Sequence, residues 1–318
     1  MSTSLQIQLI QAVGFTVANV ERSVAFYMQA LEFEVVSDTV VKGQTYSDTE
    51  EIADTEVRIV TLKLGDEKIR LTQYLGTKGK PVPPDSHSND LWFQHLAIVV
   101  NDMDRAYAHL RQFDIEPIST APQTIPPGNK EAAYIQAFKF KDPDRHDLEL
   151  IWFPPDKGQP KWHQKHDQLF LGIDHTAIAI THTEESLYFY RDLLGMHVDG
   201  GSFNWRETQA RMDGLPNAKV RITALRPALG GFGIELLDYI EPTNGRSIPS
   251  DLKSYDIAYV QAEFMVSDIH EAMHQLRQKN IQIGLPKTIQ LGDCTAYEGC
   301  LIKDLTGHAL LLIAEPAA

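Results

Sequence analysis

The sequence predicts an α+β fold built from four tandem βαβββ modules within 318 residues. The first observation is a repeat: segments 13–35 and 174–198 each show an alternating strand, a polar turn, a helix and a second strand. Segments 94–118 and 261–284 show the same pattern, and similar residues occupy equivalent offsets in all four. A repeat of about 80 residues indicates one supersecondary unit used several times. The predicted modules span 6–78, 92–155, 170–241 and 257–316.

The elements of each module follow from local patterns. In the third module, His175, Ala177 and Ala179 alternate with apolar or Thr residues, which predicts a strand with two different faces. An Asp, Asn or Thr then precedes apolar residues spaced by three and four, which predicts a capped amphipathic helix. Later strands are predicted at 219–227 and 232–240, joined by a hairpin turn at Gly230 and Gly231. The second module has corresponding strands at 132–143 and 146–154.

The joins between modules are polar and rich in proline. They cover 76–90, 154–167 and 241–256. The middle join is the natural boundary between two halves of the chain. We therefore expect an N-terminal domain at 1–155, a linker at 156–167 and a C-terminal domain at 168–318.

Charge and composition exclude several classes of protein. The sequence has 29 Lys and Arg residues and 43 Asp and Glu residues, which gives a formal net charge of −14. This balance argues against binding to nucleic acid or to an anionic membrane, both of which need a basic surface. The sequence contains no apolar run of about 18 residues and no signal-peptide pattern at its start. With only Cys294 and Cys300 available, no disulfide framework is expected, and a cytoplasmic location is the default.

Several phrases carry a family resemblance: DHTAIAI (174–180), SLYFYRDLLGM (186–196), ELLDYIEP (235–242) and FKDPDRHDLELI (140–151). Together with the four modules, they resemble the vicinal oxygen chelate superfamily, also known as the glyoxalase/bleomycin resistance/dioxygenase fold. Its members include glyoxalase I, extradiol dioxygenases, methylmalonyl-CoA epimerase and fosfomycin-resistance proteins. The resemblance implies that modules pair into cupped, incomplete barrels around one divalent metal. It also implies that each module can offer a ligand from its first strand and another from its last.

The residues in these ligand positions differ between modules. The first-strand positions hold Ala12, His95, His175 and Gln261, and the last-strand positions hold Arg70, Glu149, Glu235 and Leu311. The first and fourth modules therefore lack a usable set, whereas the second and third are complete. The resemblance implies that His95, Glu149, His175 and Glu235 bind one ion of Fe, Mn, Ni, Co or Zn. A Glu inside an apolar strand supports this, because a buried unpaired carboxylate is costly.

The ligand distribution bears on how the modules pair. If modules pair in chain order, each barrel receives one His and one Glu. If the second pairs with the third and the first with the fourth, the chain has one full site and one without ligands. We favour this second arrangement, although exchange of modules between the chains of a homodimer would give the same full site.

The predicted site favours chemistry on a small substrate with vicinal oxygens. Glu149 or Glu235 is expected to act as a base in a glyoxalase-like isomerase, lyase or epimerase that works through an enediolate. One alternative is an Fe(II)-dependent dioxygenase using two His and one carboxylate. Another is a non-catalytic binding protein of the bleomycin-resistance kind. His146 is expected near the site as a supporting group, whereas His163 and His166 are expected to be solvated linker residues.

Overall fold

The computed structural model describes residues 5–42, 55–165, 167–291 and 296–315. His166 and Cys294 lie outside this range, as do parts of the predicted first and fourth modules. The first module contains β1 Leu9–Thr16, α1 Val20–Leu31, β2 Glu34–Lys42, β3 Glu56–Leu64 and β4 Glu67–Leu75. The second contains β5 Phe93–Val100, α2 Met103–Leu110, β6 Glu116–Pro117, β7 Gln123–Thr124, β8 Gln136–Lys141 and β9 Asp147–Trp152. A short 3-10 helix, Pro160–His163, follows in the linker.

The second half of the chain repeats this order with one addition. The third module contains β10 Phe170–Ile180, α3 Thr183–Leu187 with a π-helical continuation Tyr188–Leu193, β11 His197–Asn204, α4 Arg206–Asp213, β12 Lys219–Arg226 and β13 Gly233–Glu241. The fourth contains β14 Val260–Met265, α5 Ile269–Gln278, β15 Lys287–Gln290, β16 Ala296–Lys303 and β17 Ala309–Ala314. Helix α4 has no counterpart in the second module, which the structure describes throughout.

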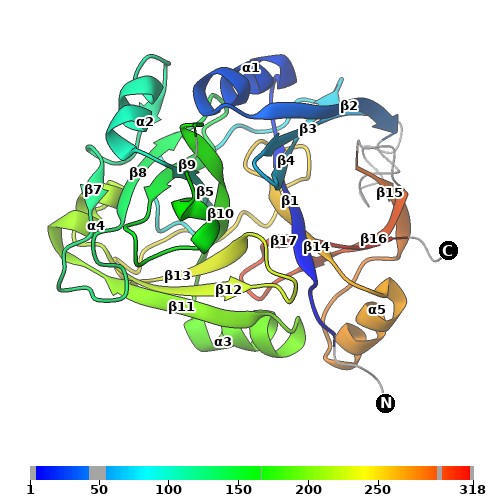
Figure 1. The fold of residues 1–318 in the computed structure, drawn as a ribbon. Coiled ribbons are helices and arrows are strands. Elements are labelled where there is room, and N and C mark those ends of the chain that lie inside the picture. The colour runs from blue at the N-terminus through cyan, green and yellow to red at the C-terminus, as the bar shows by residue number, and fades with distance from the viewer. Residues whose placement is uncertain (1–4, 43–54, 166, 292–295, 316–318) are drawn as a thin grey trace.

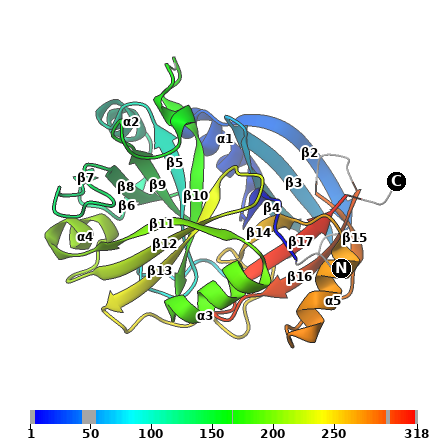
Figure 2. The same ribbon diagram turned by 60° about the horizontal axis from the view of Figure 1, so that its bottom comes forward.

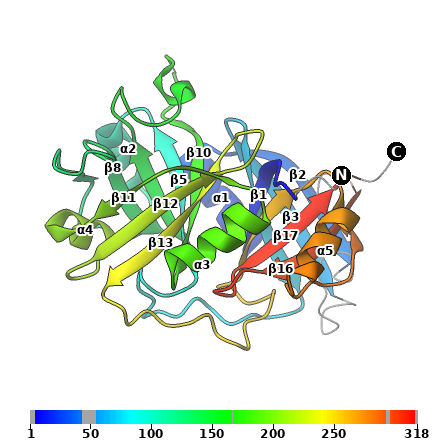
Figure 3. The same ribbon diagram turned by 90° about the horizontal axis from the view of Figure 1, so that it is seen from below.

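Two curled sheets form, and each joins modules that are not paired in chain order. One sheet has the order β15-β16-β17-β14-β1-β4-β3-β2, and the other β11-β12-β13-β10-β5-β9-β8-β6. Antiparallel pairing of β1 with β14 joins the first and fourth modules, and pairing of β5 with β10 joins the second and third. Figures 1, 2 and 3 show blue strands beside orange and red ones in one half-barrel, and cyan and green strands beside yellow-green ones in the other. The structure therefore has the second of the two arrangements considered from the sequence.

Helix starts follow the capping pattern in three modules. Asn19 caps α1 and Asp102 caps α2, each accepting a hydrogen bond from a backbone N–H in the first turn. Asp268 caps α5 in the same way. The third module differs from the prediction, because the N-cap of α3 is His182, whose side chain makes no capping bond. Thr183 instead donates its hydroxyl to Asp238 on β13.

Each first strand divides its residues between two environments. On β10, Ile178 and Ile180 join the large apolar core shared by both sheets, whereas Ala177 and Ala179 belong to a smaller cluster on the opposite face. The predicted alternation of this strand is confirmed. Gly230 and Gly231 both have positive φ values, of 80° and 88°, which suits the predicted hairpin turn between β12 and β13.

None of the helices in the described ranges is long and apolar enough to cross a membrane. The division of the chain into 1–155 and 168–318, with 156–167 between them, stays a prediction.

Candidate metal centre

Four side chains from the second and third modules meet where β5 and β10 run side by side. The Nε2 atoms of His95 and His175 lie 3.0 Å apart. Glu149 Oε2 lies 3.2 Å from His95 Nε2 and 3.8 Å from His175 Nε2. Glu235 Oε2 lies 3.3 Å from His175 Nε2. The structure thus brings together all four residues predicted as ligands, while their binding of a metal stays a prediction.

Strand register explains why these positions meet. Glu149 on β9 lies beside Ala97 on β5, two residues after His95. Glu235 on β13 lies beside Ala177 on β10, again two residues after the histidine. Because alternate residues of a strand share a face, His and Glu of each module point to the same side. The small side chains of Ala97 and Ala177 leave room for the carboxylates.

The same register holds in the modules without ligands. Arg70 pairs with Gly14, two residues after Ala12, and Leu311 pairs with Glu263, two residues after Gln261. The offsets used to identify equivalent positions in the sequence therefore correspond to equivalent places in both sheets.

A bulge precedes each of the two histidines. In the antiparallel register of β5 and β10, Asp174 has no partner between the pairs of Ile173 and His175. Gln94 likewise has no partner between the pairs of Phe93 and His95. A β-bulge re-aims side chains locally, so a residue and its successor can lie on one side of a sheet. Asp174 and Gln94 can therefore each reach the ring that follows them.

Asp174 fixes the orientation of the His175 ring and the nitrogen that carries its hydrogen. Its Oδ2 lies 3.0 Å from His175 Nδ1 and accepts the ring hydrogen, since an ionised carboxylate can only accept. Both carboxylate oxygens of Asp174 also accept from the Arg226 guanidinium at 3.1 Å. Trp162 Nε1 donates to Asp174 Oδ1 at 3.0 Å. With Nδ1 protonated, His175 presents the lone pair of Nε2 to the site.

Gln94 orients His95 through a longer network. Lys139 Nζ lies 3.4 Å from Gln94 Oε1, and Gln94 Nε2 donates to Tyr239 OH at 3.1 Å. Tyr239 OH in turn donates to Asp213 Oδ2 at 3.0 Å. Because an ammonium only donates, Lys139 fixes which end of the amide is the oxygen. That oxygen contacts His95 Nδ1, so this nitrogen carries the hydrogen and Nε2 faces the site.

Burial and neighbouring charges set the protonation of the site. Burial lowers the pKa of His95 to about 4 against the attraction of Glu149. Burial opposes charge on Glu149 as well, but His95 and the Lys139 charge outweigh it and lower the pKa of Glu149 to about 2. For His175, burial is outweighed by Glu235 and Asp174, which raise its pKa. Burial raises the pKa of Glu235. The arrangement keeps His95 neutral and Glu149 ionised, as metal ligands must be.

The donor spacing fits a single divalent ion. One donor atom each from His95, His175 and Glu235 lies within 4.8 Å of the others. Two ligands held about 2.1 Å from one ion at right angles are about 3.0 Å apart, and a tetrahedral pair is about 3.4 Å apart. The contacts of 3.0, 3.2 and 3.3 Å match these values. At this distance either a proton or a metal ion must lie between the two Nε2 atoms, and a metal ion would displace the proton that the raised pKa of His175 favours.

The four side chains line a cavity of about 620 Å³. One wall is apolar and includes Ile125, Ile151 and Phe153. Its other lining includes Lys139, Arg226 and the glycines of β11. Glu235 is the most accessible of the four, with 21% of its side chain exposed against 6% for Glu149. The cavity offers space for a small molecule directly beside the donors.

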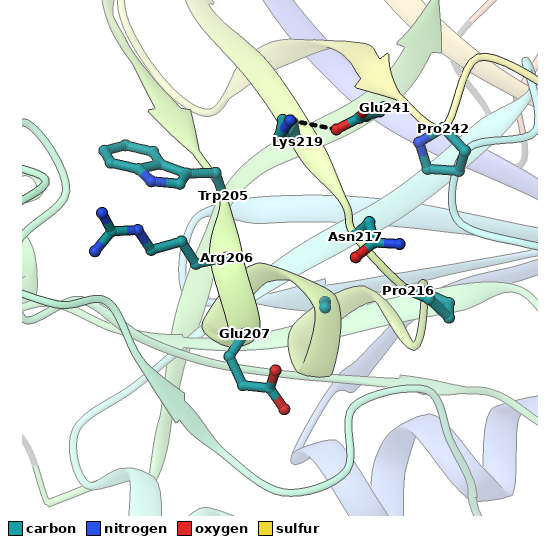
Figure 4. Close-up of a pocket in the computed structure, with 9 residues that line it drawn as sticks. Trp205, Arg206, Glu207, Pro216, Asn217, Lys219, Glu241 and Pro242 are labelled. Carbon is teal, nitrogen blue, oxygen red and sulfur yellow. Dashed lines mark ion pairs between the residues drawn. The ribbon is translucent and has the colours of Figure 1, made fainter.

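A second hollow, of about 490 Å³, lies at α4 and the start of β12. Figure 4 shows Trp205 and Arg206 on one side of it and an ion pair of Lys219 with Glu241 on the other. None of the four candidate ligands lines this hollow. It therefore does not compete with the metal centre as the place of chemistry.

In the other sheet, an ion pair stands where a ligand set would be. The side chains of Arg70 and Glu263 are fully buried, and Arg70 Nε lies 2.8 and 2.9 Å from the two carboxylate oxygens. Arg70 also donates to Thr61 Oγ1 at 2.8 Å. A guanidinium in the position of a ligand excludes a cation there, as expected for the first and fourth modules.

Two other histidines of the described ranges, His146 and His163, make their contacts away from the site. The expectation that His146 supports the metal centre is wrong, because both of its ring nitrogens have other partners. Nδ1 lies 3.0 Å from Asp142 Oδ2, and Nε2 lies 2.7 Å from the backbone oxygen of Ile257. His163 is exposed and contacts the Lys157 backbone. The supporting residues Asp174 and Gln94 were missed, although each directly precedes a candidate ligand in equivalent modules. Their equivalent places in the repeat are the sequence signal that could have identified them.

Comparison with known proteins agrees with this architecture. A sequence model of the Glyoxalase/Bleomycin resistance protein/Dioxygenase superfamily matches residues 9–150 and 172–311. Glyoxalase I from Zea mays is similar over 96% of this chain and 92% of its own, at 14% identity and a TM-score of 0.64. A putative dioxygenase from Bacillus subtilis subsp. subtilis str. 168 is similar over 99% and 87%, at 12% identity and a TM-score of 0.60. No curated protein matches the sequence. At such identities the two solved structures show a shared fold.

Proposed function

Since the chain belongs to the Glyoxalase/Bleomycin resistance protein/Dioxygenase superfamily, we propose that it is a divalent-metal-dependent enzyme acting on a small substrate with two vicinal oxygens. The observation that carries the proposal is the spacing of His95, His175 and Glu235, whose donor atoms lie within 4.8 Å of one another. Glu149 completes the set at 3.2 Å from His95. These donors line a cavity large enough for a substrate.

We assign isomerase, lyase or epimerase chemistry to this site. A bound divalent ion supplies a Lewis acid for a carbonyl and its neighbouring oxygen. His95 and His175 each offer Nε2, because Gln94 and Asp174 hold their Nδ1 hydrogens. Glu149 is buried and ionised, which suits a permanent ligand.

Glu235 is the better candidate for the base. Its side chain is the most accessible of the four to the cavity, so it can reach a substrate carbon. Its carboxylate removes a proton from the carbon beside a carbonyl, which gives an enediolate, and returns that proton to the neighbouring carbon. The reaction is a balanced isomerisation that consumes no oxidant or reductant.

A second candidate is a dioxygenase. Two histidines and one carboxylate on a common face form the ligand pattern of many non-haem Fe(II) oxygenases. His95, His175 and Glu235 satisfy that pattern by their spacing. The non-catalytic alternative is less well supported, because a protein that only binds an organic ligand has no need of a complete metal set.

The test is metal content followed by a reaction panel. The purified protein is expected to bind one Fe²⁺, Mn²⁺, Ni²⁺, Co²⁺ or Zn²⁺ per chain, and His175→Ala is expected to abolish this binding. Gln261→Ala, at the equivalent position of the fourth module, is the matched control and should bind as wild type does. Isomerisation of hemithioacetals or α-hydroxy ketones without oxygen uptake supports the first candidate. Oxygen uptake on catechols with Fe²⁺ supports the second, and failure to bind any of these metals contradicts both.

A further inference from the structure

Lys139 is a buried cation at the wall of the metal cavity, and the reaction proposed above gives it no contact with the substrate. It lies on β8 directly beside Glu149 on β9 in the antiparallel register. Only 3% of its side chain is exposed. It lines the same cavity as the four candidate ligands. Burying an ammonium is costly unless the group is paired and hydrogen-bonded, so the partners of Lys139 need to be identified.

Its contacts leave part of the ammonium available to the cavity. Lys139 Nζ lies 2.7 Å from Asp213 Oδ1 and 3.4 Å from Gln94 Oε1. An ammonium has three N–H donors. Among the residues that the structure describes, these two acceptors occupy two of them, which leaves a third for a group bound in the cavity.

Lys139 is placed to supply a hydrogen bond, and not an unbalanced charge. Asp213 balances its charge, as Glu149 with Glu235 would balance a divalent ion. The other cations of the lining are engaged elsewhere: Arg226 contacts Asp174 and Asp199, and Lys157 donates to a backbone oxygen. Lys157 lies in the linker, whereas Lys139 is buried on the strand beside Glu149, so Lys139 is the better placed to meet an oxygen bound at the metal.

We propose that Lys139 is a substrate-binding residue, which donates a hydrogen bond to a negatively charged oxygen of a substrate chelated at the metal. This inference rests on the proposed metal site and narrows its substrates to those that bind as anions through vicinal oxygens. An N–H supplied by a cation in a buried site stabilises such an oxygen more strongly than a neutral donor does.

The experiment uses the full chain loaded with Co²⁺ and acetohydroxamate as the probe. Acetohydroxamate binds metals as a monoanion through two adjacent oxygens. Co²⁺ affinity is measured by titration calorimetry, and probe affinity by the change in the Co²⁺ visible spectrum. Lys139→Met should weaken probe binding by about tenfold or more. Co²⁺ affinity should fall by less, and not to zero, because Lys139 also orients Gln94 behind the ligand His95. Lys139→Arg should restore most of the probe affinity.

Lys141→Met is the matched control. Lys141 lies on the same strand, is buried and pairs with Asp147 at 2.5 Å, but it does not line the cavity. Its variant should bind the probe as wild type does. If Lys139→Met does not fold, Lys139→Gln replaces it, because the Gln amide can still donate to Asp213 while carrying no charge.

The outcomes separate this inference from the function on which it rests. If the wild-type chain binds no Co²⁺, the proposed metal site is wrong. If Co²⁺ binds but the uncharged Lys139 variants keep full probe affinity, Lys139 has no contact with the substrate oxygen. An equal fall of Co²⁺ and probe affinity also overturns the inference, since Lys139 would then act only by orienting Gln94 and Glu149.

Discussion

His95 and His175 lie in different modules, 80 residues apart, yet their Nε2 atoms are separated by only 3.0 Å. Each ring has its Nδ1 side held by the residue before it, so both unprotonated nitrogens turn toward the same point. Two such lone pairs repel each other unless a proton or cation lies between them. The hydrogen bonds behind the rings therefore favour a shared proton or a metal ion between the two Nε2 atoms.

The role of Asp174 can be tested by Asp174→Asn. An amide in this position can donate to His175 Nδ1 and so favour the tautomer with its hydrogen on Nε2. We expect Co²⁺ affinity to fall by about 10- to 100-fold, measured by competition with a chelator. Asp199→Asn is the control, because Asp199 also pairs with Arg226 but is half-exposed. Equal Co²⁺ affinities of the two variants would show that Asp174 does not orient the ligand.

Substitution of Glu149 and of Glu235 should affect different properties, namely Co²⁺ affinity and turnover. Glu149→Gln removes a buried ligand and should chiefly lower Co²⁺ affinity. Glu235→Gln removes the base and should lower the rate of isomerisation by about 100-fold or more, with a smaller loss of Co²⁺ binding. The measurements are calorimetric titration with Co²⁺ and turnover at saturating metal. A Glu235→Gln enzyme with wild-type turnover would rule out the assignment of the base.

The ion pair of Arg70 with Glu263 should matter for stability and not for metal binding. Removing one partner of a buried pair leaves a charge in a poorly solvated place, at a cost of about 3–5 kcal/mol in the free energy of unfolding. Glu263→Leu should show this loss in urea denaturation, and the double variant with Arg70→Met should regain much of it. Co²⁺ stoichiometry should stay at one per chain.

An exposed pair provides the control for that experiment. Lys219 and Glu241 form an ion pair with about half of each side chain in solvent. Glu241→Ala should change the free energy of unfolding by less than about 1 kcal/mol. If Glu263→Leu is no more costly than Glu241→Ala, the buried pair does not replace the missing ligand set as a structural element.

Stability should depend on pH through His146. Burial disfavours the charged ring, but the Asp142 carboxylate outweighs it and raises the pKa of His146 from 6.5 to about 9. A raised pKa stabilises the folded state fully below about pH 6.5, and the contribution disappears as the pH rises through 9. The unfolding free energies of wild type and His146→Gln should thus differ most at pH 6, by up to about 3 kcal/mol, and converge by pH 10. A constant difference between wild type and His146→Gln over this range would contradict the charged pairing with Asp142.

Much of this fold was predictable because the repeat fixes equivalent positions. Once His175 and Glu235 are aligned with His95 and Glu149, the offsets alone identify Arg70 and Leu311 as their counterparts, and the strand registers agree. The crosswise pairing of modules was also favoured by the distribution of ligands. Period-two alternation is local, so it survives in any tertiary arrangement.

The supporting residues were harder to predict for a physical reason. Asp174 and Gln94 act through bulges, where an extra residue interrupts the alternation on which strand patterns rely. Asp213 comes from α4, which has no counterpart in the fully described second module, so comparison of these two modules does not reveal it. Glu263 shows the opposite difficulty: a Glu in an apolar strand looks like a ligand by the argument used for Glu235, yet it pairs with Arg70.

The central claim is that one metal ion is shared by the second and third modules. The most direct measurement is the anomalous difference map of a crystal of the full chain grown with Co²⁺. We predict a single strong peak about 2.0–2.2 Å from Nε2 of both His95 and His175, with Glu149 or Glu235 completing the coordination. A peak bound elsewhere, or one that contacts only one of the two histidines, would contradict the shared site.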